Sequence, residues 1–129
     1  DIFYQAKLGN NFSCFLEKET RLPMMFMEDA IRATLNLMEA PAENIRVRSS
    51  YNLSGCDFTP NEIANEIKGH LPDFQIDYNP DSRQAIADSW PSSIDDSEAR
   101  KDWGWSEKYD LQDLVNVMLE NIDVQLLAK

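Results

Sequence analysis

The feature that most constrains the fold is a helix stop followed at once by a bulky aromatic residue, in residues 93–105. Asp95 is placed to cap a short helix, and Glu98 stands at the third helical position, where it completes a capping box. Gly104 supplies the left-handed residue that ends such a helix. Trp105 then needs an interior position for its large ring. The stretch predicts a short helix, a sharp stop and a buried indole.

A second helix is predicted after this stop, capped by Asp110. Its apolar residues recur at helical spacing: Leu111, Leu114, Val115, Met118 and Ile122. Thr59 and Glu62 frame another capping box, with Pro60 at the first helical position and with Ile63 and Ile67 facing inward. That helix is expected to end at Gly69, with His70 just past it.

A further helix is predicted from Glu28 and Asp29, acids that favour a helix N-terminus, and Pro41 closes it. Its predicted inward face consists of Ala30, Ile31, Thr34, Leu35 and Met38. Its predicted water-facing residues are Arg32, Asn36 and Glu39. Strands are predicted at 12–16, 22–27, 51–53 and 74–78, and residues 83–91 are expected to be irregular and suited to ligand contact. Taken together, these predicted elements indicate a mixed α and β domain with roughly four helices and several short strands.

Composition excludes several classes of function. The chain has 129 residues, 43% hydrophobic and 27% charged, and a formal net charge of −11. That charge opposes binding to nucleic acid or to an anionic membrane. Two cysteines without a CxxC pair and a single histidine argue against zinc and predict free thiols in a reducing compartment. No apolar run approaches the ~20 residues that span a bilayer.

The sequence carries no complete catalytic site. Its four glycines, Gly9, Gly55, Gly69 and Gly104, make no glycine-rich phosphate turn. No Ser/His/acid or Cys/His set has a convincing base. Residues 1–9 read as the body of a helix already under way, without an initiating Met. We therefore expect the C-terminal piece of a longer protein.

Three short motifs carry a family resemblance: DxSxAR at 95–100, WGW at 103–105 and YDL at 109–111. Together they resemble the C-terminal signature of the extended short-chain dehydrogenases, the epimerase/dehydratase-like group. Trp103 stands where that group usually has Leu. The segment at 21–34 is similar to a second conserved stretch of the same group.

A more specific resemblance covers nearly the whole chain, from about residue 1 to about residue 122. It rests on LPMMFM at 22–27, MEAPA at 38–42, RSSYNL at 48–53 and RQAIADSWP at 83–91. These segments are similar to the short-chain L-threonine 3-dehydrogenase family. The resemblance implies an α/β fold with an NAD-binding Rossmann half, in which residues 1–129 form the C-terminal substrate-binding portion and the N-terminal Rossmann half is absent from this chain.

The family reaction oxidises the C3 hydroxyl of L-threonine with NAD to 2-amino-3-oxobutanoate, a step in threonine catabolism to glycine. The resemblance places NAD and a catalytic Tyr/Lys pair in the missing half. Consistent with this, no tyrosine here has a lysine four residues on. The family resemblance also implies an amino-acid substrate and a homodimeric parent protein. It implies a location in the cytoplasm or, in a eukaryote, in the mitochondrial matrix. This chain alone is expected to be inactive.

The resemblance also implies substrate-side residues. Trp90 corresponds to a position that shapes the substrate pocket and excludes a sugar nucleotide; a core or interface tryptophan is the other reading. Arg83 and Arg21 match positions that hold phosphates in sugar-nucleotide members. Threonine has no phosphate, so pairing with carboxylates such as Asp88, or a part in pocket closure, is favoured. Asp88 and Ser89 are further pocket candidates.

Two other functions stay open. A nucleotide-sugar epimerase or dehydratase fragment shares the motifs, although Trp90 and the apolar run at 22–27 speak against a large anionic substrate. A non-catalytic interaction module would explain the missing catalytic groups, although the start within a helix speaks against it.

Overall fold

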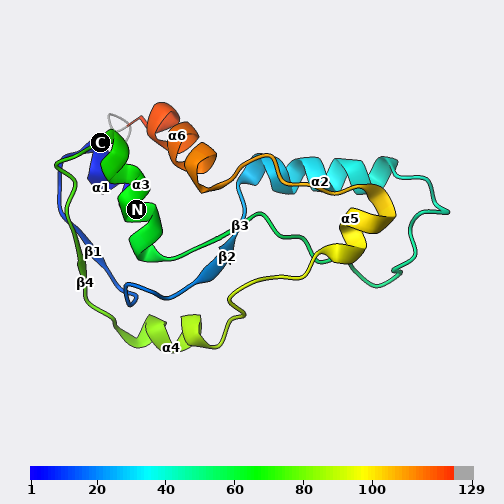
Figure 1. The fold of residues 1–129 in the computed structure, drawn as a ribbon, viewed down its shortest axis with the longest axis horizontal. Coiled ribbons are helices and arrows are strands. Elements are labelled where there is room, and N and C mark those ends of the chain that lie inside the picture. The colour runs from blue at the N-terminus through cyan, green and yellow to red at the C-terminus, as the bar shows by residue number, and fades with distance from the viewer. Residues whose placement is uncertain (124–129) are drawn as a thin grey trace.

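The computed structural model describes residues 1–123, and these contain six helices and four short strands (Figure 1). The prediction of about four helices was therefore too low. The elements in chain order are α1 Ile2–Lys7, β1 Phe12–Cys14, β2 Leu22–Met24, α2 Met27–Glu39, β3 Cys56–Phe58, α3 Pro60–His70, β4 Ile76–Tyr78, α4 Ser82–Asp88, α5 Ser97–Trp103 and α6 Leu111–Asn121.

The strands form two separate pairs. β1 lies parallel to β4, with Phe12 opposite Ile76, and β2 lies antiparallel to β3, with Leu22 opposite Phe58. The strand predicted at 51–53 is wrong, because the partner of β2 begins only after Gly55. A Cβ at Gly55 would lie 2.8 Å from the carbonyl oxygen of Met24, so glycine permits this close approach.

The largest core lies where α1, α3 and α6 meet. Ile67 of α3 and Val115 of α6 are fully buried, and Phe3 of α1 packs in the same cluster. Phe74 closes it from the chain entering β4. The predicted inward positions of α3 and α6 are confirmed. In Figure 1 these helices occupy one end of the molecule, while α2 and α5 occupy the other.

Helix ends follow the sequence predictions closely but not everywhere. Thr59 forms the predicted capping box with Glu62, and Asp110 caps α6. Gly104 ends α5 with φ +73°, and Trp105 is buried. The capping box predicted at the start of α5 does not form.

The N-cap of α5 is Asp96, and the neighbouring Asp95 instead accepts the amide hydrogen of Ser97 at 3.0 Å. The Asp96 carboxylate accepts hydrogen bonds from Arg100 Nε at 2.8 Å and from the Ser54 amide at 3.2 Å. His70, predicted just past α3, is its exposed last residue.

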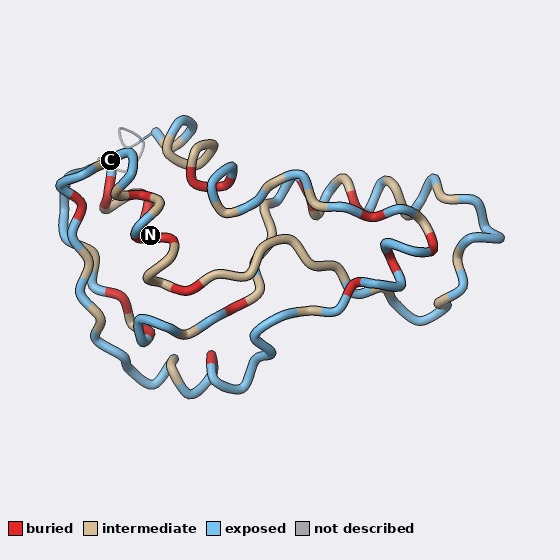
Figure 2. Tube along the Cα trace, viewed as in Figure 1, coloured by how far each residue is buried: buried red, intermediate tan, exposed pale blue. Residues whose placement is uncertain are grey.

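Helix α2 is turned about its axis relative to the prediction. Its buried residues are Asp29 and Ala33, whereas Ile31, Leu35 and Met38 of the predicted inward face are more than half exposed. The small Ala33 packs with Trp105 and Ala99 in one buried cluster, which fixes this orientation. In Figure 2, exposed segments recur along α2.

Arg32 was predicted to face water, but its side chain lies against Trp105, in the buried cluster that also contains Ala33 and Ala99. Its guanidinium carbon is 4.9 Å from the centre of a Trp105 ring, and Nη2 donates to Asp29 and to the Ser106 carbonyl, both at 2.6 Å. A cation over an indole face is favourable. Arg32 thus helps to hold the segment after Gly104 against α2.

Candidate functional site

The segment at 83–91, predicted to be irregular, contains most of helix α4. Asp81 caps this helix by accepting the amide hydrogen of Arg83 at 2.9 Å. One face of α4 and the residues that follow it border a groove of about 270 Å³. The groove is lined by Phe15, Leu16, Leu22, Met24, Arg83, Ile86, Ala87 and Trp90.

Two of the predicted site residues, Arg83 and Trp90, line this groove from the two ends of α4. Trp90 follows the helix, and its amide donates to the Ala87 carbonyl at 3.0 Å. Its side chain is half exposed, so the indole forms a rim and not part of the buried core. Trp90 is therefore not a core tryptophan within the described residues, and its roles in a substrate pocket or at an interface both stay predictions.

Arg83 is held by contacts on both sides. Its guanidinium makes paired hydrogen bonds with the carboxylate of Asp81, and its carbon lies 3.5 Å from the centre of the Phe15 ring. The hydrogen bonds to Asp81 raise the pKa of Arg83, and the same bonds lower the pKa of Asp81. The predicted carboxylate pairing is confirmed, but the partner is Asp81 and not Asp88.

The other three predicted residues lie outside the groove lining. Asp88 accepts a hydrogen bond from Gln84 at 2.7 Å, and the Ser89 hydroxyl donates to the Ile86 carbonyl at 2.6 Å. Arg21 donates to the Asp57 carbonyl at 2.7 Å and pairs with Glu62 at the start of α3. The structure therefore does not bring Arg21 near Arg83 in one cluster.

Glu62 connects Arg21 to the capping box of α3. The amide of Thr59 donates to Glu62, and this bond, opposed by partial burial and reinforced by Arg21, lowers the pKa of Glu62. Arg21 thus pairs with a carboxylate, as predicted, and fastens the β2–β3 pair to α3. Its contacts are structural ones.

Gln84, which was not among the predicted site residues, fastens α4 to the loop after β1. The Gln84 carbonyl oxygen accepts the Glu17 amide hydrogen at 2.8 Å, and its amide nitrogen donates to Thr20 at 2.9 Å and to Asp88. Only its place within the 83–91 motif could have singled it out. Gln84 sets the distance between α4 and the opposite wall of the groove.

The groove continues along β1 and β2 into a second hollow of about 370 Å³, and both are lined by Phe15, Leu16, Leu22 and Met24. The shared wall is almost wholly apolar. An uncovered apolar surface of this kind, next to a polar rim, is typical of a ligand site or of a contact with another part of a protein.

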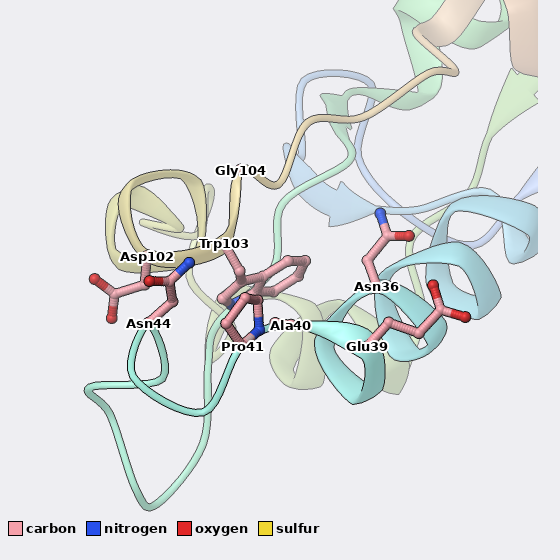
Figure 3. A pocket seen from close by; sticks show the side chains of 8 residues that line it. All are labelled: Asn36, Glu39, Ala40, Pro41, Asn44, Asp102, Trp103 and Gly104. Atoms are coloured by element: carbon pink, nitrogen blue, oxygen red, sulfur yellow. The ribbon is translucent and has the colours of Figure 1, made fainter.

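A third hollow, of about 390 Å³, lies between the C-terminal end of α2 and the end of α5 (Figure 3). Its lining includes Glu39, Asn44, Asp102 and Trp103. The Asp102 carboxylate accepts a hydrogen bond from Tyr51 at 2.7 Å and lies 3.8 Å from Arg46, so it ties the loop 41–51 to α5. None of the predicted site residues lies there.

The described residues do not fit an NAD phosphate site. The two glycines with positive φ among the described residues, Gly9 and Gly104, follow helices instead of preceding them. No glycine-rich strand-to-helix turn is therefore present in residues 1–123.

Residues 1–123 also contain no group of three or more His, Cys, Asp or Glu side chains that could hold a metal ion. None of the helices in this range is long and apolar enough to cross a membrane.

Known proteins resemble this chain over nearly all of its length. No family model matches it. A curated relative from Bos taurus, mitochondrial L-threonine 3-dehydrogenase, is 54% identical over 92% of this chain. A solved L-threonine dehydrogenase from Cupriavidus necator superposes with a TM-score of 0.92 at 54% identity, covering 95% of this chain.

The chain spans 32% of the length of the Bos taurus relative and 44% of the Cupriavidus necator chain. A UDP-glucuronic acid 4-epimerase from Bacillus cereus, solved with UDP-glucuronic acid and NAD, shares the fold with a TM-score of 0.74 at 16% identity. The fold is thus that of the C-terminal part of an extended short-chain dehydrogenase, and the resemblance stated from the motifs is confirmed.

Proposed function

We propose that this chain is the substrate-side portion of an NAD-dependent L-threonine 3-dehydrogenase, which oxidises the C3 hydroxyl of L-threonine to 2-amino-3-oxobutanoate in threonine catabolism. The observation that carries the proposal is the groove walled by Trp90 and Arg83, in a chain that is 54% identical to relatives of that name. The N-terminal part of the enzyme holds NAD and supplies the Tyr/Lys pair.

The shape and charge of the groove support a small substrate. Trp90 narrows one end with a bulky ring, and the apolar wall along β2 leaves little for a sugar or pyrophosphate to bind. Of the described residues that line the groove, only Arg83 is cationic, and Asp81 already neutralises it. A sugar nucleotide would need free positive charge here.

Within this proposal, the groove encloses threonine when the two parts of the enzyme close on each other and exclude water from the reacting carbon. Trp90 covers the substrate methyl group, while Asp88 and Ser89, which precede it in the chain and do not line the groove, stay further pocket candidates. Arg83 keeps Phe15 and α4 in contact, so it shapes the groove instead of binding substrate directly. The full enzyme is a homodimer, located in the cytoplasm or, in a eukaryote, in the mitochondrial matrix.

The test uses the full-length enzyme with Trp90 intact, with Trp90→Gly and with Trp90→Phe. We measure NADH formation from L-threonine and, separately, turnover of a UDP-sugar. Removal of the ring should reduce kcat/KM for threonine about tenfold or more, whereas Trp90→Phe should retain most activity. Trp103→Phe is the matched control, because it removes an indole from the third hollow and not from the groove.

Each result bears on a different part of the proposal. Threonine-dependent NADH that falls only in Trp90→Gly supports both the activity and the role of Trp90. Turnover that is indifferent to Trp90 keeps the activity and removes the pocket role. No turnover of threonine, or turnover of the UDP-sugar, rejects the dehydrogenase and favours the epimerase.

A further inference from the structure

Asp81 and Arg83 form one charged unit at the start of α4, beside the groove. Arg83 Nε lies 3.0 and 3.1 Å from the two carboxylate oxygens of Asp81, and Nη2 lies 2.6 Å from one of them. The Phe15 ring covers one face of the guanidinium, at 3.5 Å from the guanidinium carbon. Asp81 therefore occupies one of the two edges through which an arginine binds phosphate or carboxylate by paired hydrogen bonds, and it offsets the charge of the other edge.

The backbone holds Asp81 in place for this pairing. Its carboxylate accepts the Arg83 amide hydrogen at 2.9 Å as the N-cap of α4, and its own amide donates to the Phe15 carbonyl at 3.2 Å. In Figure 1, α4 follows β4 at the end of the β1–β4 pair, so the bond to Phe15 extends this pairing up to the helix. Both side chains are about half exposed. Exposed ion pairs are usually weak because two mobile side chains must be ordered, but here the cap already orders the carboxylate.

The groove holds no second cation that could replace Arg83. Among the described residues, Arg83 is the only charged one that lines the groove, and the neighbouring hollow adds only Asp1, an acid. A phosphorylated ligand that entered the groove would leave water for an apolar wall without an unpaired positive charge, which is unfavourable. The formal charge of −11 on the chain also opposes the approach of an anion.

We infer that Asp81 is a specificity-determining residue, which excludes phosphorylated ligands from the groove by pairing with Arg83. This inference deepens the proposed function and rests on it, because the hydroxyl and methyl groups of the threonine side chain need no free cation, whereas a phosphoryl group does. A residue that served only as the N-cap of α4 would not need a charge, since Ser, Thr and Asn cap helices as well. Without the charge of Asp81, the same Arg83 is free to bind a phosphoryl group.

The test measures binding of inorganic pyrophosphate to the full-length enzyme by titration calorimetry at low ionic strength. Asp81→Asn keeps the size of the side chain and an oxygen that caps α4, but it removes the charge. A double variant, Asp81→Asn with Arg83→Gln, removes the freed cation as well. Asp73→Asn, at an exposed position outside the groove lining, is the matched control, because it changes the net charge of the chain by the same amount.

We expect Asp81→Asn to bind pyrophosphate at least about tenfold more tightly than the unsubstituted enzyme, and we expect this gain to shrink as the ionic strength rises. The gain should disappear in the double variant. Unchanged affinity in Asp81→Asn overturns the inference, and so does a gain that survives the loss of Arg83 or that Asp73→Asn reproduces. If Asp81→Asn does not fold, as judged by circular dichroism, Asp81→Ser removes the same charge with another capping side chain.

Pyrophosphate binding requires no turnover, so the inference and the proposed function can fail separately. Where L-threonine supports NADH formation, pyrophosphate should inhibit Asp81→Asn in competition with L-threonine, as expected for a gained site in the groove. Inhibition that L-threonine does not relieve overturns the placement of that site. Absence of threonine-dependent NADH formation rejects the proposed function, whereas the comparison of pyrophosphate affinities decides the role of Asp81.

Discussion

The carboxylate of Asp29 lies 3.0 Å from the amide nitrogen of Lys108, although 79 residues separate them in the chain. A second bond joins the same oxygen to the Tyr109 amide at 3.1 Å, and Arg32 donates to the other oxygen at 2.6 Å. Asp29 is fully buried. This one side chain therefore fixes α2 against the turn that leads into α6.

Asp29→Asn should lower the free energy of unfolding by about 3 kcal/mol at neutral pH. The amide would leave Arg32 without its buried counter-charge and would direct an N–H group at backbone donors. Urea unfolding followed by circular dichroism measures the change. Asp73→Asn, at an exposed position, is the control and should have little effect. Equal stability of both variants would contradict the role given to Asp29.

The acid limb of the stability curve should also depend on Asp29. Burial by itself would raise its pKa, but the bonds from Arg32, Lys108 and Tyr109 outweigh burial and lower the pKa below its ordinary value. A lowered pKa stabilises the fold above the ordinary carboxyl pKa, and this stabilisation is lost as the pH falls through the lowered value.

Unfolding free energies measured between neutral and strongly acidic pH therefore test the titration of Asp29. The unsubstituted chain should lose stability toward acid more steeply than Asp29→Asn, which has no carboxyl group to protonate. Parallel curves for the two proteins would show that the pKa of Asp29 is not lowered by folding.

The Cys56 thiol should react slowly with alkylating reagents. Burial, with smaller contributions from Asp57 and other nearby carboxylates, raises its pKa to about 11. At pH 8 only about a thousandth of such a thiol is the reactive thiolate. Iodoacetamide labelling of native protein, with peptide mass analysis to separate Cys56 from Cys14, should show a rate that climbs until pH 11. A plateau near pH 9 would contradict the raised pKa.

Local signals in the sequence predicted local structure well. The capping box of Thr59 and Glu62, and the stop at Gly104, depend only on residues within one or two helical turns. The failure at α5, by contrast, has a cause outside the local sequence. Asp95 and Asp96 are adjacent and both suit the cap, and the contact of Asp96 with Ser54, distant in sequence, decides between them.

The orientation of α2 could not be predicted, because periodicity shows which residues share a face but not what covers that face. Met38 and Ala33 both belong to plausible apolar sides, and the packing of Trp105 selects the side of Ala33. The candidate site, too, was only partly predictable from the sequence. Its motif at 83–91 was recognisable, but the partners of Arg83 and Arg21 depend on contacts between separate elements.

Gln84→Ala in the full-length enzyme should raise KM for L-threonine several-fold with a smaller change in kcat. The substitution removes the bonds to Glu17 and Thr20, so α4 is no longer held at a fixed distance from the loop after β1. Trp90, two residues past α4, then loses its set position on the groove rim. Gln84 acts as a positioning residue, because it lies outside the groove lining.

Steady-state kinetics separates this effect from a general loss of stability. Gln84→Glu keeps an oxygen that can accept from the Glu17 amide and should retain more of the threonine affinity than Gln84→Ala. Gln75→Ala, at an exposed position before β4, is the matched control for loss of an amide side chain. A fall in kcat with KM unchanged would place Gln84 outside substrate positioning, and an equal response to Gln75→Ala would show that the groove does not depend on this clamp.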